Sequence, residues 1–228
     1  MTLQIGFLVF PDITQLDMTG PHEVLARLPG ATIHLAWKSL EPITAQSGLR
    51  LIPTVTLQDC PQLDLICVPG GPGVNPLMND EPVLEFVRRQ AAGARYITSV
   101  CTGALVLGAA GLLRGKRATT HWMSLEMLSL FGATPVKART VVDGNLITGG
   151  GVTAGIDFAL RILAEIAGEN AAKGAQLGIE YDPMPPFHAG SPDGAGPAIT
   201  DALRTASSAG QAQRLAAARQ AAARLGTA

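Results

Sequence analysis

Three continuous apolar runs constrain the fold of this chain more than any other feature. Leu3–Phe10, Leu63–Val68 and Tyr96–Val100 are each almost free of charged residues, and each ends at a turn or at the start of a helical pattern. A strand that is apolar on both faces must be covered on both faces, as in a parallel sheet between helices. Because such strands alternate with helices along most of the chain, we predict an α/β fold with a mainly parallel sheet.

Composition narrows the class of protein further. Hydrophobic residues make up 47% of the 228 residues and charged residues 15%, against roughly 25% charged in an average chain, which excludes a disordered protein. The 17 Lys and Arg residues nearly balance 18 Asp and Glu, so we expect no nucleic-acid or membrane partner. The longest apolar run, Ala104–Leu113, is about half the ~20 residues of a membrane span. Met1–Phe10 lacks the basic start of a signal peptide, and we expect a cytoplasmic protein.

We expect one α/β domain over residues 1–197 and an Ala/Arg-rich C-terminal helix over residues 198–228. Asp182–Pro197 contains five prolines and predicts an extended segment on the surface. The tail that follows carries four arginines against one aspartate. Its apolar residues share one helical face, which favours a docked helix over a frayed tail. These residues are Leu215, Ala218, Ala222 and Leu225.

Cys101 stands at the junction of a buried strand and an apolar helix. Small residues, Ser99 and Gly103, lie two positions on either side, as in a nucleophile elbow, where the strand and the helix cross closely. At a helix N-terminus the dipole and the free N–H groups favour a thiolate. Cys101 is therefore a candidate nucleophile, and a small buried core cysteine is the alternative. For Cys60 and Cys67 we prefer that alternative, and without a CxxC motif we predict no disulfide framework, metal site or cofactor.

A thiolate needs a partner that handles protons, and Asp17 is the better candidate. It lies between Leu16 and Met18, just beyond the first strand, at the sheet edge expected to carry Cys101. Partial burial there should raise its pKa, so that it can hold and return a proton. A helix N-cap is the alternative for Asp17. His121 could lie at the same edge, although we favour a capping or packing role for it.

Two glycine clusters can present backbone N–H groups to a ligand at this edge. Gly70-Gly71-Pro72-Gly73 follows a strand and Gly149-Gly150-Gly151 precedes a helix. Neither matches a nucleotide-binding motif. We expect the substrate pocket beside Cys101 to be lined by Gly70, Gly71, Gly150, Gly151, Val152, Thr153 and His121.

Several of these features together resemble the ThiJ/PfpI branch of the class I glutamine amidotransferase-like superfamily. They are the acidic Asp17 after the first strand, the turn at Pro69-Gly70-Gly71, the Cys101 elbow and the block Thr119-Thr120-His121-Trp122. The resemblance covers residues 3–197. It implies a flavodoxin-like α/β sandwich that forms homodimers.

Longer blocks resemble the isocyanide-hydrating members of that branch. They are Gln15–His22, Val100–Gly103, Gly149–Asp157 and the Pro-Pro-Phe and Gly-Ser-Pro pieces between Pro185 and Pro192. The resemblance implies hydration of a small apolar isocyanide, R–N≡C, by water to an N-formamide. It assigns Cys101 as the nucleophile that forms a thioimidate, Asp17 as general acid and base, and Thr102 as a supporting hydrogen-bonding residue. Because isocyanides carry little charge, we expect a largely apolar pocket.

Three other functions compete with this interpretation. PfpI-like peptidases usually have histidine after the cysteine, where this chain has Thr102. Glyoxalase- or deglycase-like members usually have glutamate in place of Asp17. Ligand-sensing domains of AraC-type regulators share the Cys101-Thr102-Gly103 pattern. Those regulators add two helix-turn-helix units, for which the tail beyond residue 197 is too short. An enzyme is the interpretation that we prefer.

Overall fold

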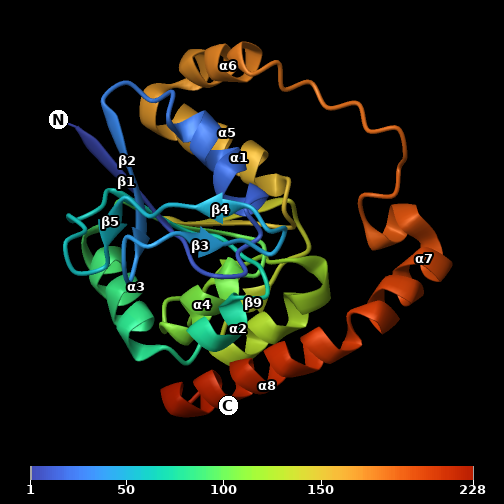
Figure 1. The fold of residues 1–228 in the computed structure, drawn as a ribbon. Coiled ribbons are helices and arrows are strands. Elements are labelled where there is room, and N and C mark those ends of the chain that lie inside the picture. Colours follow the sequence, from blue (N-terminus) through green and yellow to red (C-terminus); the bar gives the residue numbers. More distant parts are fainter. Residues whose placement is uncertain (1, 228) are drawn as a thin grey trace.

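A seven-stranded sheet separates two layers of helices in the computed structural model, which describes residues 2–227 (Figure 1). Its strand order is β10-β11-β7-β6-β1-β2-β5. All neighbouring strands are parallel except β10 and β11, which form an antiparallel pair at one edge. The mainly parallel, flavodoxin-like α/β sandwich predicted from the sequence is confirmed. The strands are β1 (Leu3–Leu8), β2 (Ala31–Trp37), β5 (Val55–Thr56), β6 (Leu65–Val68), β7 (Tyr96–Val100), β10 (Thr140–Asp143) and β11 (Leu146–Gly149).

Helices cover both faces of this sheet, which explains the continuous apolar runs. On one face lie α1 (Leu16–Leu25) and α5 (Ala154–Ala167), with α6 (Glu169–Gly178) packed on α5 (Figure 1). The opposite face is covered by α2 (Val74–Leu77), α3 (Glu81–Gly93), α4 (Gly103–Ala109) and the 3₁₀ helix η1 (Trp122–Phe131). All four residues of β6 and all seven of α4 are buried. The turn between β7 and α4 therefore lies within the core.

The path of the chain reverses direction in the middle of the sheet, between β1 and β6. From β1 it moves to β2 and β5 on one side, and it then returns to β6 and β7 on the other side of β1. Ligands of open α/β sheets bind outside the carboxyl ends of the strands at such a reversal. Asp17, Gly70 and Cys101 follow β1, β6 and β7, respectively. The topology thus brings three predicted site residues to one place.

Short elements outside the central sheet differ from the expectation. The predicted strand Arg117–Thr120 is reduced to β8 (Arg117–Ala118), which pairs with β9 (Thr134–Pro135). The expected hairpin around Ser47-Gly48 is present as β3 (Ile43–Thr44) and β4 (Arg50–Leu51). Helices η1, α2 and α6 were not anticipated.

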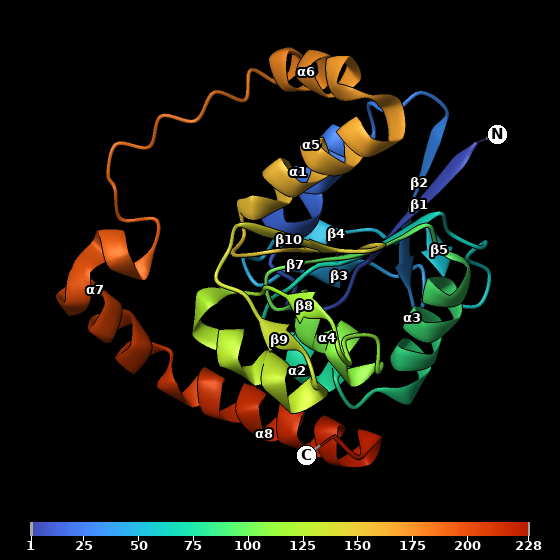
Figure 2. The same cartoon turned by 180° about the vertical axis from the view of Figure 1, so that it is seen from behind.

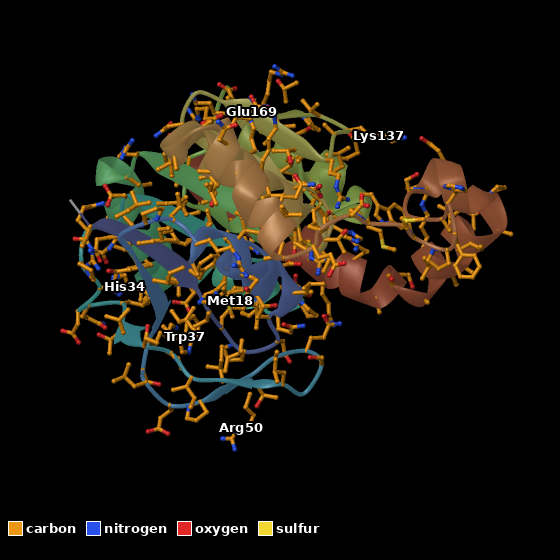
Figure 3. All side chains as sticks on the ribbon, turned by 90° about the horizontal axis from the view of Figure 1, so that it is seen from above. Met18, His34, Trp37, Arg50, Lys137 and Glu169 are labelled. Carbon is orange, nitrogen blue, oxygen red and sulfur yellow. The ribbon has the colours of Figure 1, made fainter. Side chains whose placement is uncertain are left out.

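The C-terminal part of the chain crosses from one helical layer to the other (Figures 1 and 2). Residues 181–191 have no regular structure, but α7 (Pro192–Ala206) begins earlier than expected, so the prediction of an extended segment is wrong for residues 192–197. Ser191 caps this helix by accepting a hydrogen bond from Gly194 N, and Pro192 suits the first helical position because it lacks an N–H. In Figure 3, Lys137 lies on the side of the body that faces α7, and its Nζ donates to Asp193.

Helix α8 (Ser208–Leu225) packs against α2, α4 and η1 (Figure 2). Ala218, Ala221 and Ala222 are fully buried in this contact. These small side chains let α8 approach α2, α4 and η1 closely. Arg214 and Arg224 of α8 donate hydrogen bonds to Asn75 and Met78, respectively. Within residues 2–227, no helix is long and apolar enough to cross a membrane.

Candidate active site

Cys101 occupies a strained turn between β7 and α4. Its φ is +55°, a value that residues with a side chain seldom adopt. The turn is held because Cys101 N donates to the carbonyl oxygens of Gly149 at 3.1 Å and Gly150 at 2.7 Å. A Cβ on Gly103 would lie 1.9 Å from the carbonyl oxygen of Val68. The close crossing that the elbow pattern predicted is therefore present.

Asp17 is fully buried in the first turn of α1. Its Oδ2 accepts a hydrogen bond from Gly70 N at 2.8 Å, whereas the cap position of the helix belongs to Gln15. The helix-cap interpretation of Asp17 is thus wrong. The other oxygen, Oδ1, is buried and has no hydrogen-bond partner within residues 2–227. A carboxyl group with one oxygen anchored and the other free is oriented but able to exchange a proton.

Burial raises the pKa of Asp17 from 3.8 to about 7, although the Gly70 N–H and the nearby Cys101 lower it in part. The expected rise in the pKa of this carboxyl is confirmed, and its cause is desolvation of the charged form. The group therefore gains and loses its proton near neutral pH. That is the property required of a general acid and base.

The expectation of a low pKa for Cys101 is wrong. Burial, and to a lesser extent the Asp17 carboxylate, raises the pKa of its thiol to about 12, although the N–H groups of Thr102 and Val152 lower it in part. The helix N-terminus is thus outweighed by desolvation and by a neighbouring negative charge. A thiolate forms readily here only if Asp17 takes up the proton, because the two charges oppose each other.

The backbone of Gly70 lies between the side chains of Asp17 and Thr102 and contacts both. A Cβ at this position would lie 2.6 Å from Thr102 N and Oγ1, and 2.8 Å from Asp17 Oδ2. Buried Thr102 accepts a hydrogen bond on Oγ1 from Gly71 N at 3.0 Å. Thr102 and Gly70 therefore fix the turn after β6 against the elbow and keep Asp17 in place.

A pocket of about 540 Å³ opens beside Cys101. Three of the predicted lining residues, Gly71, Val152 and His121, line it, together with Thr102. The expectation of a largely apolar pocket holds only in part, because amide side chains and one arginine share the lining with apolar residues. These polar residues are Gln46, Asn75, Gln211, Gln213 and Arg214.

The remaining predicted lining residues lie elsewhere. Gly150, Gly151 and Thr153 line an adjoining pocket of about 510 Å³, with which the Cys101 pocket shares His121 and Val152. Gly70 is buried beneath the site. His121 caps η1, where its Nδ1 accepts a hydrogen bond from Met123 N at 3.4 Å. The capping interpretation of His121 is thus confirmed, and burial lowers the pKa of its ring.

The other sequence expectations at the site concern cysteines and metals. Cys67 lies fully buried in β6, and burial raises the pKa of its thiol to about 12. Cys60 is also buried, and burial raises its pKa to about 11. Both cysteines are core residues, as predicted. Among residues 2–227, no cluster of three or more His, Cys, Asp or Glu side chains is arranged to hold a metal ion.

Sequence reasoning missed the contribution of the C-terminal helices to the pocket. Ser207, Gln211 and Arg214 reach the pocket from the end of α7 and from α8. The excess of arginine in the tail was visible in the sequence. It did not indicate which arginine faces the site.

A parallel α/β sandwich with a cysteine in a strained strand-to-helix turn, next to a buried carboxyl group, defines a distinct class of protein. The chain belongs to the DJ-1/PfpI family, whose model matches residues 4–165. Over 204 residues it is 62% identical to the isonitrile hydratase of Pseudomonas putida, with 90% of each chain covered. Isonitrile is another word for isocyanide.

The chain is also similar to a solved structure and to a more distant relative. The crystal structure of a ThiJ/PfpI family protein from Pseudomonas syringae matches with a TM-score of 0.93 at 44% identity, covering 96% of this chain and 91% of the other. The glutathione-independent glyoxalase DJR-1.2 of Caenorhabditis elegans is 28% identical, over 69% of this chain and 84% of its own. Helices α7 and α8 lie beyond the part that the family model matches.

Proposed function

We propose that this protein is an enzyme that hydrates isocyanides to N-formamides, with Cys101 as the nucleophile and Asp17 as the proton carrier. One observation supports this above the others. A chain 62% identical to an isonitrile hydratase has a buried carboxyl group with a pKa of about 7 beside the cysteine of a substrate-sized pocket. Hydration of R–N≡C requires a soft nucleophile and one proton that can move, and this pair supplies both.

In the first step, the Cys101 thiol gives its proton to Asp17, and the thiolate attacks the terminal carbon of the isocyanide. The S–C bond forms while Asp17 returns the proton to that same carbon. The product is the thioimidate R–N=CH–S–Cys101. The free Oδ1 of Asp17 is the oxygen that we assign to this transfer, because Oδ2 is engaged by Gly70 N.

In the second step, the Asp17 carboxylate accepts a proton from water as the water oxygen attacks the thioimidate carbon. Asp17 gives that proton to the nitrogen of the adduct. The C–S bond then breaks as the hydroxyl of the adduct becomes the formyl C=O, and the hydroxyl proton passes to the Cys101 sulfur, so that R–NH–CHO leaves and the thiol is restored. Thr102 acts as a positioning residue, since it holds the turn after β6 against the elbow. Neither step requires an oxidant or a cofactor.

The decisive experiment follows loss of the isocyanide infrared band and appearance of the formamide by chromatography, with glyoxal and a peptide as competing substrates. We expect isocyanide turnover, its complete loss in Cys101→Ala, and normal turnover in Cys67→Ala, which removes a thiol from the core. Activity on glyoxal without isocyanide consumption contradicts the proposal.

The Asp17→Asn variant separates the two steps. Asparagine keeps the size of the side chain but cannot transfer a proton, so turnover should fall ~100-fold or more. If hydrolysis suffers more, the thioimidate accumulates and mass spectrometry finds the substrate mass on the peptide containing Cys101. If the first step suffers more, no adduct appears. Full activity of the variant contradicts the role of Asp17.

We also propose that the protein works as a homodimer in the cytoplasm. Large apolar side chains are exposed along α6, α7 and the segment that joins them, which supports association with a second copy. The three cysteines are free, as is usual in a reducing compartment. The exposed residues are Leu177, Met184, Phe187, Ile199 and Leu203. Sedimentation of a species near 23.6 kDa at micromolar concentration contradicts the dimer, and recovery in a membrane or extracellular fraction contradicts the location.

A further inference from the structure

Of the described residues 2–227, those that line the pocket beside Cys101 include a single permanently charged side chain, Arg214 of α8. No aspartate or glutamate is among the sixteen residues that line it. Its histidine, His121, has its pKa lowered by burial and is therefore neutral at physiological pH. Whatever occupies the pocket thus meets one permanent positive charge.

Arg214 has no carboxylate partner within residues 2–227. Its Nε donates to Asn75 Oδ1 at 3.1 Å, and one terminal nitrogen donates to Ser124 Oγ at 3.4 Å. Both acceptors are neutral, and the other terminal nitrogen makes no hydrogen bond to a residue of this range. Burial lowers the pKa of the guanidinium, and the nearby Cys101 raises it by less, yet an arginine remains charged in a protein. A half-buried cation without a counter-charge is unfavourable unless a ligand supplies one.

Among residues 2–227, Arg214 is the one arginine in the lining of the Cys101 pocket. Arg139 is paired with Asp157, and Arg204 is paired with Asp201. Arg224 lies on the same helix as Arg214 and docks it to α2 by donating to Asn79 Oδ1 at 2.8 Å and Met78 O at 2.9 Å. Arg224 is not part of the pocket lining. Arg224 therefore docks α8 from outside the pocket, whereas Arg214 docks α8 and also faces the pocket.

We propose that the natural substrates are isocyanides that carry a carboxylate, and that Arg214 binds this carboxylate while the isocyano carbon lies at Cys101. The guanidinium is a planar fork that matches a carboxylate with two parallel hydrogen bonds. The side-chain amides of Asn75, Gln211 and Gln213 line the same pocket and add neutral donors. This inference rests on the proposed hydration of isocyanides and specifies its substrate class.

The test compares isocyanoacetate and 3-isocyanopropanoate with their methyl esters, which have the same reacting group but no charge. For the wild-type protein, kcat/KM should be at least ~10-fold higher for one of the carboxylates than for its ester. Arg214→Gln should lower kcat/KM for that carboxylate by ~10- to 100-fold, mainly through KM, as expected for one charge-assisted hydrogen-bonded contact. For the ester it should stay within about threefold of wild type.

Two variants serve as controls. Arg224→Gln removes the other docking arginine of α8, and it should leave the carboxylate-to-ester ratio unchanged. Arg214→Lys keeps the charge but loses the fork, so its ratio should fall between those of the wild type and Arg214→Gln. If Arg214→Gln does not fold, the wild-type ratio and the lysine variant still decide the question.

The outcomes separate this inference from the function on which it rests. Turnover of the esters with no preference for a carboxylate overturns the inference and leaves isocyanide hydration standing. An equal loss for carboxylate and ester in Arg214→Gln also overturns it, because Arg214 then acts on the Cys101–Asp17 pair. If the protein consumes neither kind of isocyanide, the proposed function fails, and this inference fails with it.

Discussion

Replacing Asp17 by asparagine should stabilise the folded protein above pH 7. In the folded chain, burial raises the pKa of this carboxyl from 3.8 to about 7. Between these pH values the folded state keeps a proton that the unfolded state has lost. Folding stability therefore decreases as pH rises through this interval, by ~1.4 kcal/mol per pH unit. Over about three pH units, the unfolding free energy of the wild-type protein therefore falls by roughly 4 kcal/mol.

Asparagine does not titrate, so the variant lacks this contribution. The unfolding free energy of Asp17→Asn minus that of wild type should therefore increase from pH 4 to pH 7 and stay constant above. Urea unfolding followed by circular dichroism, at one protein concentration and several pH values, measures this difference. Asp182→Asn removes the same formal charge from an exposed position and controls for net charge. A difference that does not change with pH refutes the reasoning that burial raises the pKa of Asp17.

Three further predictions concern the rate of isocyanide turnover. The pair of Cys101 and Asp17 holds two protons below about pH 7 and one above. The form with one proton can start the reaction, so kcat/KM of the wild type should rise with pH through about 7. A pH–rate profile of Asp17→Asn should lack this rise. Gly70→Ala should reduce kcat/KM by about 100-fold, because its Cβ displaces Asp17 and Thr102, whereas Gly190→Ala, with open space around the new Cβ, should match wild type in the same assay. Thr102→Val removes about one neutral hydrogen bond, ~1 kcal/mol, and should lower kcat/KM about fivefold; an unchanged value contradicts its positioning role.

The central strands and the elbow could be predicted because their constraints are local in the sequence. Burial of both faces of β6 requires a continuous apolar run, and the close crossing at Cys101 requires small residues at fixed offsets, here Ser99 and Gly103. The parallel arrangement then places the carboxyl ends of neighbouring strands at one edge. That rule is sufficient to predict from the sequence that Asp17 lies near Cys101.

The features that were missed depend on contacts between distant parts of the chain. The pKa of Cys101 follows from burial and from Asp17, which comes from another element, and not from the helix that starts beside it. The position of Arg214 follows from the docking of α8 on α2 and η1. Helix η1 was missed because no 3.6-residue apolar period marks a 3₁₀ helix, although His121 caps its start and Gly132, with φ +72°, ends it.

Helix α8 has a consequence for how the protein is made. Ribosomes add residues from the N-terminus at about 5–20 per second, so the sheet, the elbow and Asp17 are all synthesised before Ser208–Leu225. For a time on the order of seconds, the nascent chain contains Cys101 and Asp17 but lacks α8, the helix that carries Arg214 and lines one side of the pocket. During that interval the Cys101 thiol is less covered than in the finished protein, because α8 is absent. The buried alanines of α8, Ala218, Ala221 and Ala222, are the last side chains to be buried. Assembly of the chemistry thus precedes assembly of the surface that selects what reaches it.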